Sequence, residues 1–232
     1  MTRLGVVVGL AAEAEIAARA EALPDHPAPL LAVSGADSAR AAEAAGRLIA
    51  EGAQALMSFG IAGALSPALR PGALLQATAV ILPDGGRIET DPSWRERLGS
   101  CLEGGGLKPV EGPLLGSAEA VTTPEAKAER FARHGALAVD MESHAVAAAA
   151  RQAGLPFLAL RSVADPAERA LPAWAMAATA ADGTVKLGTA IAALCRRPWQ
   201  VPASIRLGAE TRRALAVLSR AVRLCPHLGL GL

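Results

Sequence analysis

Short apolar runs alternate along the chain with alanine-rich segments whose charged residues recur at helical spacing. Apolar runs of strand type occupy residues 4–10, 30–35, 53–60, 72–82, 135–140 and 155–165. Helical patterns follow over 11–23, over 37–52 and in the alanine-rich stretch after Asp140. This alternation predicts an α/β fold, a single domain whose central sheet is largely parallel or mixed and is flanked by helices. With 232 residues the chain is long enough to bury the core of one such domain.

Two segments interrupt the alternation. Residues 83–112 are rich in glycine, proline and charge, which predicts an excursion over the surface. Residues 166–185 carry prolines directly after a strand and a later Asp-Gly pair, which predicts a mobile flap beside the carboxyl ends of the strands.

The segment 203–224 has the pattern of a basic amphipathic helix. At about 100° per residue its arginines fall within an arc of about 120°, and an apolar stripe takes the opposite side. The arginines are Arg206, Arg212, Arg213, Arg220 and Arg223, and the stripe consists of Leu207, Ala214, Leu215, Leu218, Ala221 and Val222. Two interpretations stay open. The helix packs on the domain or on a subunit partner, or it lies on a membrane surface with its arginines at anionic headgroups.

Composition and charge narrow the class of protein. A hydrophobic fraction of 52% with 19% charged residues is typical of a globular chain, and a net charge of +1 gives no general attraction to nucleic acid. The charge is uneven, however. From Arg196 onward there are seven arginines and Glu210 as the one acid, a net charge of +6 that leaves −5 for the rest. A basic end on an acidic body suggests an anionic partner for that end.

The cysteines and the apolar runs bear on metal binding and location. Cys101, Cys195 and Cys225 lie far apart without a CxxC spacing, which argues against a disulfide framework and against a zinc site, and four scattered histidines do the same. We expect no metal and no cofactor. The N-terminal apolar run is too short for a secretory signal, and no run approaches the roughly 20 residues of a membrane-spanning helix. We therefore expect a cytoplasmic protein, with peripheral contact at the inner membrane if the basic helix binds lipid.

Carboxylates follow three of the predicted strands. Glu13 comes after the first strand, Glu142 after the strand that ends at Asp140, and Asp165 ends the last strand. Because the carboxyl ends of parallel strands meet at one edge of a sheet, we expect these three acids to converge there. Such groups can protonate a leaving group, orient water or bind paired hydroxyls, as cleavage of a glycosidic bond requires. Asp140 has the simpler interpretation of capping the helix that follows.

The first strand and turn, "VVVGLAAEAE", exclude one alternative. They lack the Gly-x-Gly-x-x-Gly pattern that lets a backbone approach a pyrophosphate, so a dinucleotide-binding domain is not expected. A function of another class also stays open, namely a protein of this fold that binds a nucleoside or a lipid without catalysing a reaction.

Four segments carry a resemblance to a known family. "VVGLAAEAEI", "SFGIAGALSPALRPGALL", "AVDMESHAVA" and "FLALRSVADPA" occur in the order and spacing typical of the nucleoside phosphorylase and nucleosidase superfamily, over roughly residues 4 to 195. That superfamily includes purine nucleoside phosphorylase and methylthioadenosine/S-adenosylhomocysteine nucleosidase. The "VDMESHAVA" form, the Asp-Pro-Ala after the last strand and the arginine-rich tail are most similar to hopanoid-associated phosphorylases. The resemblance implies a three-layer catalytic domain over 1–198 and a helical extension over 199–232.

The resemblance also implies a role for individual residues. Asp165 matches the acid that protonates the purine ring nitrogen, and Glu13 matches the acid that holds the attacking water in nucleosidases. The implied substrate-binding residues are Glu142 at the ribose hydroxyls, Met141 under the sugar, Val121 at the base through its backbone, and the small-residue loop Gly60, Ile61, Ala62 and Gly63.

Three departures from the family pattern bear on the substrate. Ile61 and Ala164 stand where the family usually has serine, and Ala120 stands where it usually has an aromatic residue. Together they predict a roomier and more apolar pocket, which favours a purine nucleoside with a bulky apolar 5′ substituent such as adenosylhopane. Methylthioadenosine or S-adenosylhomocysteine is the alternative substrate.

The nucleophile is either water or phosphate. Related phosphorylases place an arginine on the strand before the small-residue loop, but "ALMSFG" has none and Glu13 would repel an anion. The residues therefore favour hydrolysis over phosphorolysis, unless Arg40, Arg70 or Arg87 folds into the site. Family members usually self-associate, so we expect a homodimer.

Overall fold

The computed structural model describes residues 2–20, 27–172, 180, 182–184, 199 and 201–229. The strands are β1 (Leu4–Val8), β2 (Leu30–Val33), β3 (Ala55–Ala64), β4 (Leu74–Ile81), β5 (Arg87–Glu89), β6 (Val110–Gly116), β7 (Ala138–Asp140) and β8 (Phe157–Asp165). The helices are α1 (Ala11–Ala17), α2 (Ser38–Ala50), α3 (Pro92–Gly104), α4 (Pro124–His134), α5 (Ser143–Ala153) and α8 (Val201–Leu224).

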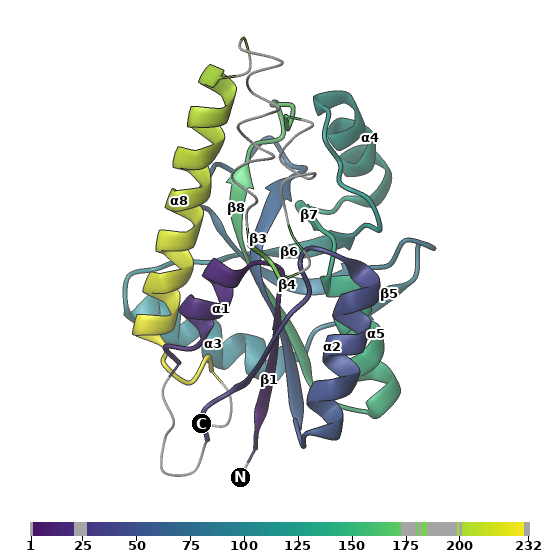
Figure 1. Cartoon of the computed structure of the whole chain (residues 1–232), viewed down its shortest axis with the longest axis vertical. Helices are drawn as coiled ribbons and strands as arrows, with labels where there is room; N and C mark the ends of the chain where they lie inside the picture. Colours follow the sequence, from purple (N-terminus) through teal and green to yellow (C-terminus); the bar gives the residue numbers. More distant parts are fainter. Residues whose placement is uncertain are drawn as a thin grey trace.

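The strands form one mixed sheet at the centre of the molecule (Figure 1). Its order is β2-β1-β3-β7-β6-β4-β5, and β8 pairs with both β3 and β4. The pairs β1–β2, β1–β3, β3–β8, β4–β6 and β6–β7 are parallel, while β3–β7, β4–β5 and β4–β8 are antiparallel. The α/β class and the mixed sheet predicted from the sequence are thus confirmed. Because β1, β3 and β8 run in the same direction, their carboxyl ends meet at one edge.

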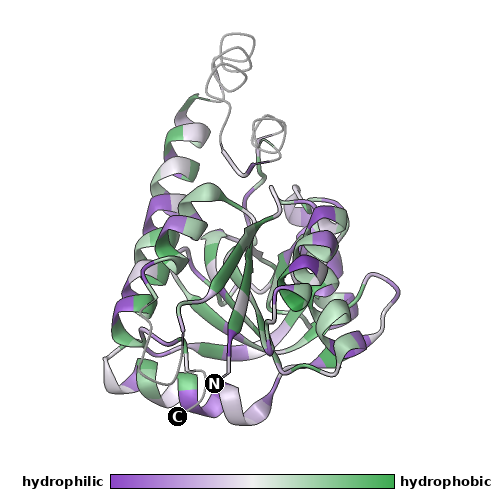
Figure 2. Ribbon diagram, turned by 60° about the horizontal axis from the view of Figure 1, so that its bottom comes forward, coloured by the Kyte–Doolittle hydropathy of each residue, from purple (hydrophilic) through white to green (hydrophobic). Residues whose placement is uncertain are grey.

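Helices cover the sheet on both sides and produce three layers (Figure 1). On one side α2 and α5 contribute Ala41, Leu48, Val146 and Ala150 to an apolar core. On the other side α1, α3 and α8 contribute residues such as Ile16, Trp94 and Leu218. Successive residues of β3 alternate between the two cores, as a strand requires, and the apolar colour lies mainly on the central strands (Figure 2).

The prediction that residues 83–112 form an irregular excursion over the surface is wrong. This stretch contains β5, α3 and the start of β6. The helix begins because the Asp91 side chain accepts a hydrogen bond from the Trp94 amide and Pro92 lies in the first turn. Trp94, Leu98 and Leu102 recur every four residues and are buried. The sequence therefore contains the apolar face of a helix, although its glycine, proline and charged residues resemble those of a loop.

Other elements also differ from expectation. The strand expected to give way to a loop at residue 60 continues as β3 through Ala64, paired with β8 on one side and β7 on the other. The flap expected at 166–185 lies partly outside the described residues, since residues 173–179, 181 and 185 are not described. Helix α4 was not anticipated; Thr123 caps it by accepting a hydrogen bond from the Ala126 amide.

The amphipathic helix predicted at 203–224 is present as α8, and its apolar stripe packs on the domain. Ala214, Leu218, Ala221 and Val222 are buried, and α8 contacts β8, β3 and α1. The stripe is therefore used inside the protein rather than exposed, whereas the arginines of α8 lie on its outer face. Within the described part of the chain, no helix combines the length and the apolar character needed to cross a bilayer.

Cys101 and Cys225 form a disulfide, which the sequence analysis did not expect. The two residues are 124 positions apart in the chain, and no local sequence pattern predicts that they pair. They meet because the end of α8 returns to the side of α3.

Candidate active site

A cavity of about 390 Å³ opens where β1, β3 and β8 end. Glu13, Glu142 and Asp165 all line it, so the three predicted acids face one space. Of the other predicted site residues, Ile61, Ala62, Gly63, Val121 and Met141 line the cavity, and Gly60 lies directly behind Glu13. Asp165 and Glu142 therefore lie on the walls of the same cavity, as recognition of a single nucleoside by both would require.

Glu13 is held by the backbone at the start of α1. Its Oε2 accepts hydrogen bonds from the amides of Gly9 at 2.9 Å and Leu10 at 2.8 Å, and its Oε1 accepts one from Ile61 at 2.8 Å. The side chain is 1% exposed. Burial raises the pKa of Glu13 above its ordinary value, while Arg161 and the three amides counteract part of that rise. A fixed carboxylate with a raised pKa is suited to accept a proton.

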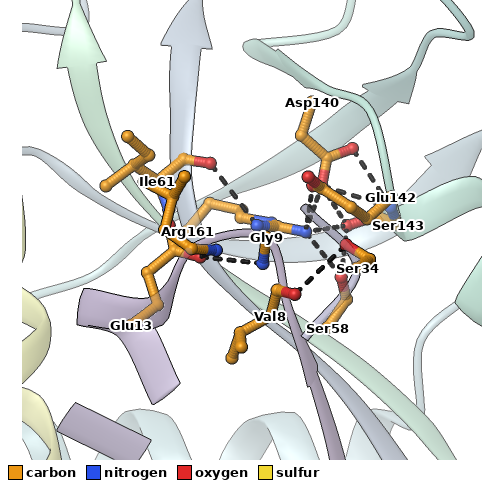
Figure 3. A network of polar contacts seen from close by, with 11 residues as sticks. Val8, Gly9, Glu13, Ser34, Ser58, Ile61, Asp140, Glu142, Ser143 and Arg161 are labelled. Carbon is orange, nitrogen blue, oxygen red and sulfur yellow. Dashed lines mark hydrogen bonds and ion pairs between the residues drawn. The ribbon is translucent and has the colours of Figure 1, made fainter. Parts of the chain in front are cut away.

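Arg161 lies among the acids and was not identified from the sequence (Figure 3). Its Nη2 contacts Glu142 at 3.2 Å and forms an ion pair with Asp140. Burial lowers the pKa of Arg161, but the carboxylates of Asp140, Glu142 and Glu13 outweigh it and raise the pKa overall. A signal was available: Arg161 is the one charged residue in the run 155–163, which is apolar apart from Ser162, and a buried arginine requires carboxylate partners.

Two serines complete this network (Figure 3). Arg161 Nη2 donates to the Ser58 hydroxyl at 2.6 Å and to the Ser143 hydroxyl at 3.1 Å. Ser58 comes from β3 and Ser143 begins α5, so the arginine joins both elements to β8. These contacts place the guanidinium on the inner wall of the cavity.

Asp140 binds the start of α5 as expected, although Glu142 and not Asp140 occupies the N-cap position, and Asp140 has a second role. Its carboxylate accepts hydrogen bonds from the Ser143 amide at 3.2 Å and the Ser143 hydroxyl at 2.5 Å. It also pairs with Arg161, a contact that local sequence did not predict.

Glu142 is 5% exposed and faces the cavity between Arg161 and Glu13. Burial, together with the charges of Asp140 and Glu13, raises the pKa of Glu142 to about 8 against the lowering effect of Arg161. The backbone approaches this group closely, since a Cβ added to Gly9 would lie 2.6 Å from Glu142 Oε1.

Asp165 forms a buried ion pair with Lys127, a residue the sequence analysis did not single out. Lys127 Nζ lies 2.5 Å from Asp165 Oδ2, and the lysine side chain is fully buried. Burial raises the pKa of Asp165, and Lys127 opposes that rise without cancelling it. Gly63 allows this arrangement, because a Cβ there would lie 3.1 Å from the Asp165 carboxylate.

The remainder of the cavity wall is largely apolar. Ile61, Ala120 and Ala164, the three departures from the family pattern, all line it. Helix α8 supplies one side through Ser204, Leu207, Gly208 and Thr211. The basic amphipathic segment therefore contributes to the site, which its sequence did not indicate.

None of the three arginines considered as phosphate ligands lines the cavity. Arg40 donates to the carbonyls of Ser34 and Gly35, and Arg70 and Arg87 form exposed pairs with Glu168 and Glu89. Among the described residues, no group of three or more His, Cys, Asp or Glu side chains is arranged to hold a metal ion.

Comparison with known proteins gives one match to a protein family. A family model described as the phosphorylase superfamily matches residues 25–196. A search of curated proteins found no match. Both Glu13 and α8 lie outside the matched segment, and the fold brings them to it.

Several solved structures share the fold at low sequence identity. A futalosine hydrolase from Helicobacter pylori is 18% identical with a TM-score of 0.73, and 96% of each chain is covered. A 5′-methylthioadenosine/S-adenosylhomocysteine nucleosidase from Neisseria meningitidis is 19% identical with a TM-score of 0.74, covering 97% of this chain and 98% of the other. The corresponding Helicobacter pylori nucleosidase is 19% identical with a TM-score of 0.70, covering 96% and 98%. At these identities the likeness establishes the fold.

Proposed function

Since the chain belongs to the phosphorylase superfamily, we propose that it is an enzyme that cleaves the N-glycosidic bond of a purine nucleoside, with adenine as the leaving base. The observation that carries the proposal is that Glu13, Glu142 and Asp165 line one cavity. The solved structures of similar fold support it, since their names describe two nucleosidases and a futalosine hydrolase.

The proposed reaction divides the work among the three acids. Asp165 donates a proton to the purine ring as the bond between the base and the anomeric carbon breaks. Glu142 binds the ribose hydroxyls by accepting their hydrogen bonds, and these bonds strengthen as the carboxyl group ionises through its pKa of about 8. Glu13 binds the water whose oxygen adds to the anomeric carbon, and it takes the proton that this water loses. The proton that Asp165 loses leaves with the base, and the proton that the water loses stays on Glu13. Solvent then reprotonates Asp165 and takes the proton from Glu13, which restores the starting state.

The charges around the cavity favour this chemistry. Four carboxylates, those of Glu13, Asp140, Glu142 and Asp165, lie with two cations, Arg161 and Lys127. As Asp165 gives up its proton, the carboxylates of Glu13, Asp140 and Asp165 outnumber the two cations, and this negative charge stabilises a ribose that becomes cationic as the base leaves.

The same charges disfavour phosphate as the nucleophile. An anion requires several N–H donors or cations, but Arg161 Nη2 is directed at two carboxylates and two hydroxyls. Glu13, which would face the nucleophile, is also acidic. We therefore propose hydrolysis rather than phosphorolysis, and a Glu13-bound water as the attacking group.

The apolar wall supports a substrate with a bulky apolar 5′ group. Ile61, Ala120 and Ala164 replace larger or polar residues of the family pattern, and Leu207 of α8 adds apolar surface. Adenosylhopane is the candidate we propose, with adenine and ribosylhopane as the products. Methylthioadenosine or S-adenosylhomocysteine is the second candidate, favoured by the named activity of two solved relatives. A binding protein without activity is the third, since it needs the same cavity.

Membrane contact and self-association complete the proposal. The outer arginines of α8 support electrostatic contact with anionic lipid at the inner membrane, through charge rather than through the buried stripe. The homodimer and the boundary between a catalytic domain over 1–198 and an extension over 199–232 stay predictions.

The test is release of adenine from each nucleoside, with and without inorganic phosphate, with products identified by mass. We expect turnover without phosphate and a water-derived oxygen on the sugar. D165N should lower the rate about 10²–10⁴-fold, the usual worth of general acid help, with its circular dichroism spectrum unchanged. D84N, at an exposed aspartate, is the matched control. If no adenine is released from any of these nucleosides, the enzymatic proposal is refuted and a binding protein without activity remains. Strict dependence on phosphate would reject hydrolysis.

A further inference from the structure

Lys127 is placed where a lysine is costly. The side chain is fully buried, and lysines are almost never fully buried unless they are paired. It also lies at the end of the first turn of α4, where the helix dipole disfavours a cation. Something at this position must therefore offset both costs.

The offset comes from three acceptors that use all three protons of the ammonium group. Nζ lies 2.5 Å from Asp165 Oδ2, 2.8 Å from the carbonyl of Pro166 and 2.9 Å from the carbonyl of Arg169. The acceptors belong to the end of β8 and the turn after it, so Lys127 connects α4 to the segment that carries the proposed acid.

This contact makes the two oxygens of Asp165 different. Oδ2 is bound by the ammonium group, whereas Oδ1 accepts no hydrogen bond from any residue that the structure describes. Asp165 lines the cavity, so one oxygen is held in the protein and the other is available to a bound base.

The other charges near Asp165 largely neutralise each other. Arg169 of the following turn pairs with Glu210 of α8, and these are the two further groups that act on the Asp165 carboxyl. Among the residues that the structure describes, Lys127 of α4 is thus the cation that forms an ion pair with Asp165 itself.

We propose that Lys127 is a positioning residue for Asp165: it binds Oδ2, leaves Oδ1 to face the base and, through its charge, limits the pH range in which Asp165 can donate a proton. This inference rests on the proposed function, because it assigns Lys127 a task in the same reaction. If the Lys127–Asp165 pair only stabilised the fold and Asp165 donated no proton, loss of Lys127 would affect stability and leave the pH range of activity alone.

The sign of the effect follows from the pair. A nearby cation favours the ionised form of Asp165 and so lowers its pKa relative to burial alone. An acid must be protonated to donate, so activity falls as the pH rises through that pKa. Loss of the Lys127 charge should therefore move the falling limb of kcat/KM to higher pH.

The experiment compares the pH dependence of adenine release by wild type, K127Q, K127M and K127R. K127Q removes the charge and keeps a donor, and K127R keeps the charge. We expect the falling limb to move up by about 1–3 pH units in K127Q and K127M, the usual effect of removing an opposite charge at contact, and to stay in K127R. K108Q removes the charge of an exposed lysine and should leave the profile unchanged.

Each other outcome overturns the inference. A neutral variant that loses activity equally at every pH, with its limb unmoved, makes Lys127 a structural residue. The same follows if both neutral variants fail to fold while K127R folds, or if K127R moves the limb as far as K127Q. A wild type that releases no adenine from any nucleoside refutes the proposed function instead, so the two failures are told apart.

Discussion

Replacing Arg161 by methionine removes one cation from the buried acids that surround it. Arg161 is 1% exposed and forms ion pairs with Asp140 and Glu142, which are themselves buried. Methionine fills similar volume but leaves these carboxylates without a cation. Breaking a buried pair by removing one partner costs about 3–5 kcal/mol, because the other charge stays buried and unpaired. We expect R161M to lose about that much free energy of unfolding at pH 8.

The loss should shrink as the pH falls. Arg161 lowers the pKa of both Glu13 and Glu142, so its removal raises their folded pKa values further above the unfolded value of 4.5. Asp140 lies beside Glu142 and Glu13 opposite it, and both add to the rise for Glu142. A carboxyl group whose folded pKa is raised favours the folded state at low pH, and this advantage is lost as the pH rises through the folded pKa. The deficit of R161M should therefore be small near pH 5 and grow by up to about 1.4 kcal/mol per pH unit for each carboxyl that titrates.

Urea unfolding measures both effects. Trp94 is buried in the core beside α8 and reports unfolding by fluorescence. R87M is the matched control, since Arg87 forms an exposed pair with Glu89 that is worth about 0–1 kcal/mol. A deficit for R161M below about 1 kcal/mol at pH 8, or an equal deficit at pH 5 and pH 8, would refute the account of Arg161 as the cation that these acids require.

Two further predictions concern Glu13 and α8. E13Q should lower adenine release about 10²–10⁴-fold while nucleoside binding is retained, because the amide cannot take the water's proton; E15Q, at an exposed glutamate, should match wild type in the same kinetic assay. L218A should cost about 2–5 kcal/mol in urea unfolding, since Leu218 is fully buried between α8 and the sheet, whereas I205A on the exposed side of α8 should change stability by less than about 0.5 kcal/mol. A wild-type rate for E13Q, or equal losses for L218A and I205A, would contradict these assignments.

The sequence by itself determined the order of most strands and helices and the edge at which the acids gather. Those features depend on local patterns: apolar runs give β1, β3 and β8, whose residues are almost all buried, and the carboxyl ends of parallel strands meet wherever such strands pair. The prediction that Glu13 and Asp165 lie at one edge of the sheet is therefore correct. Helix α3 was missed although its apolar spacing is local, because its glycine, proline and charge content resembles that of a loop.

The tertiary structure alone decided which charges meet. Arg161 reaches Glu142 and Asp140 across the sheet, Lys127 meets Asp165 from a separate helix, and Cys101 meets Cys225 across 124 positions of chain. No local period encodes such pairs, since each depends on how far and at what angle two elements pack. The use of α8 follows the same rule. Its pattern predicted an amphipathic helix, but an apolar stripe suits a sheet, a subunit or a lipid surface equally, and the packing on β8 selected the sheet.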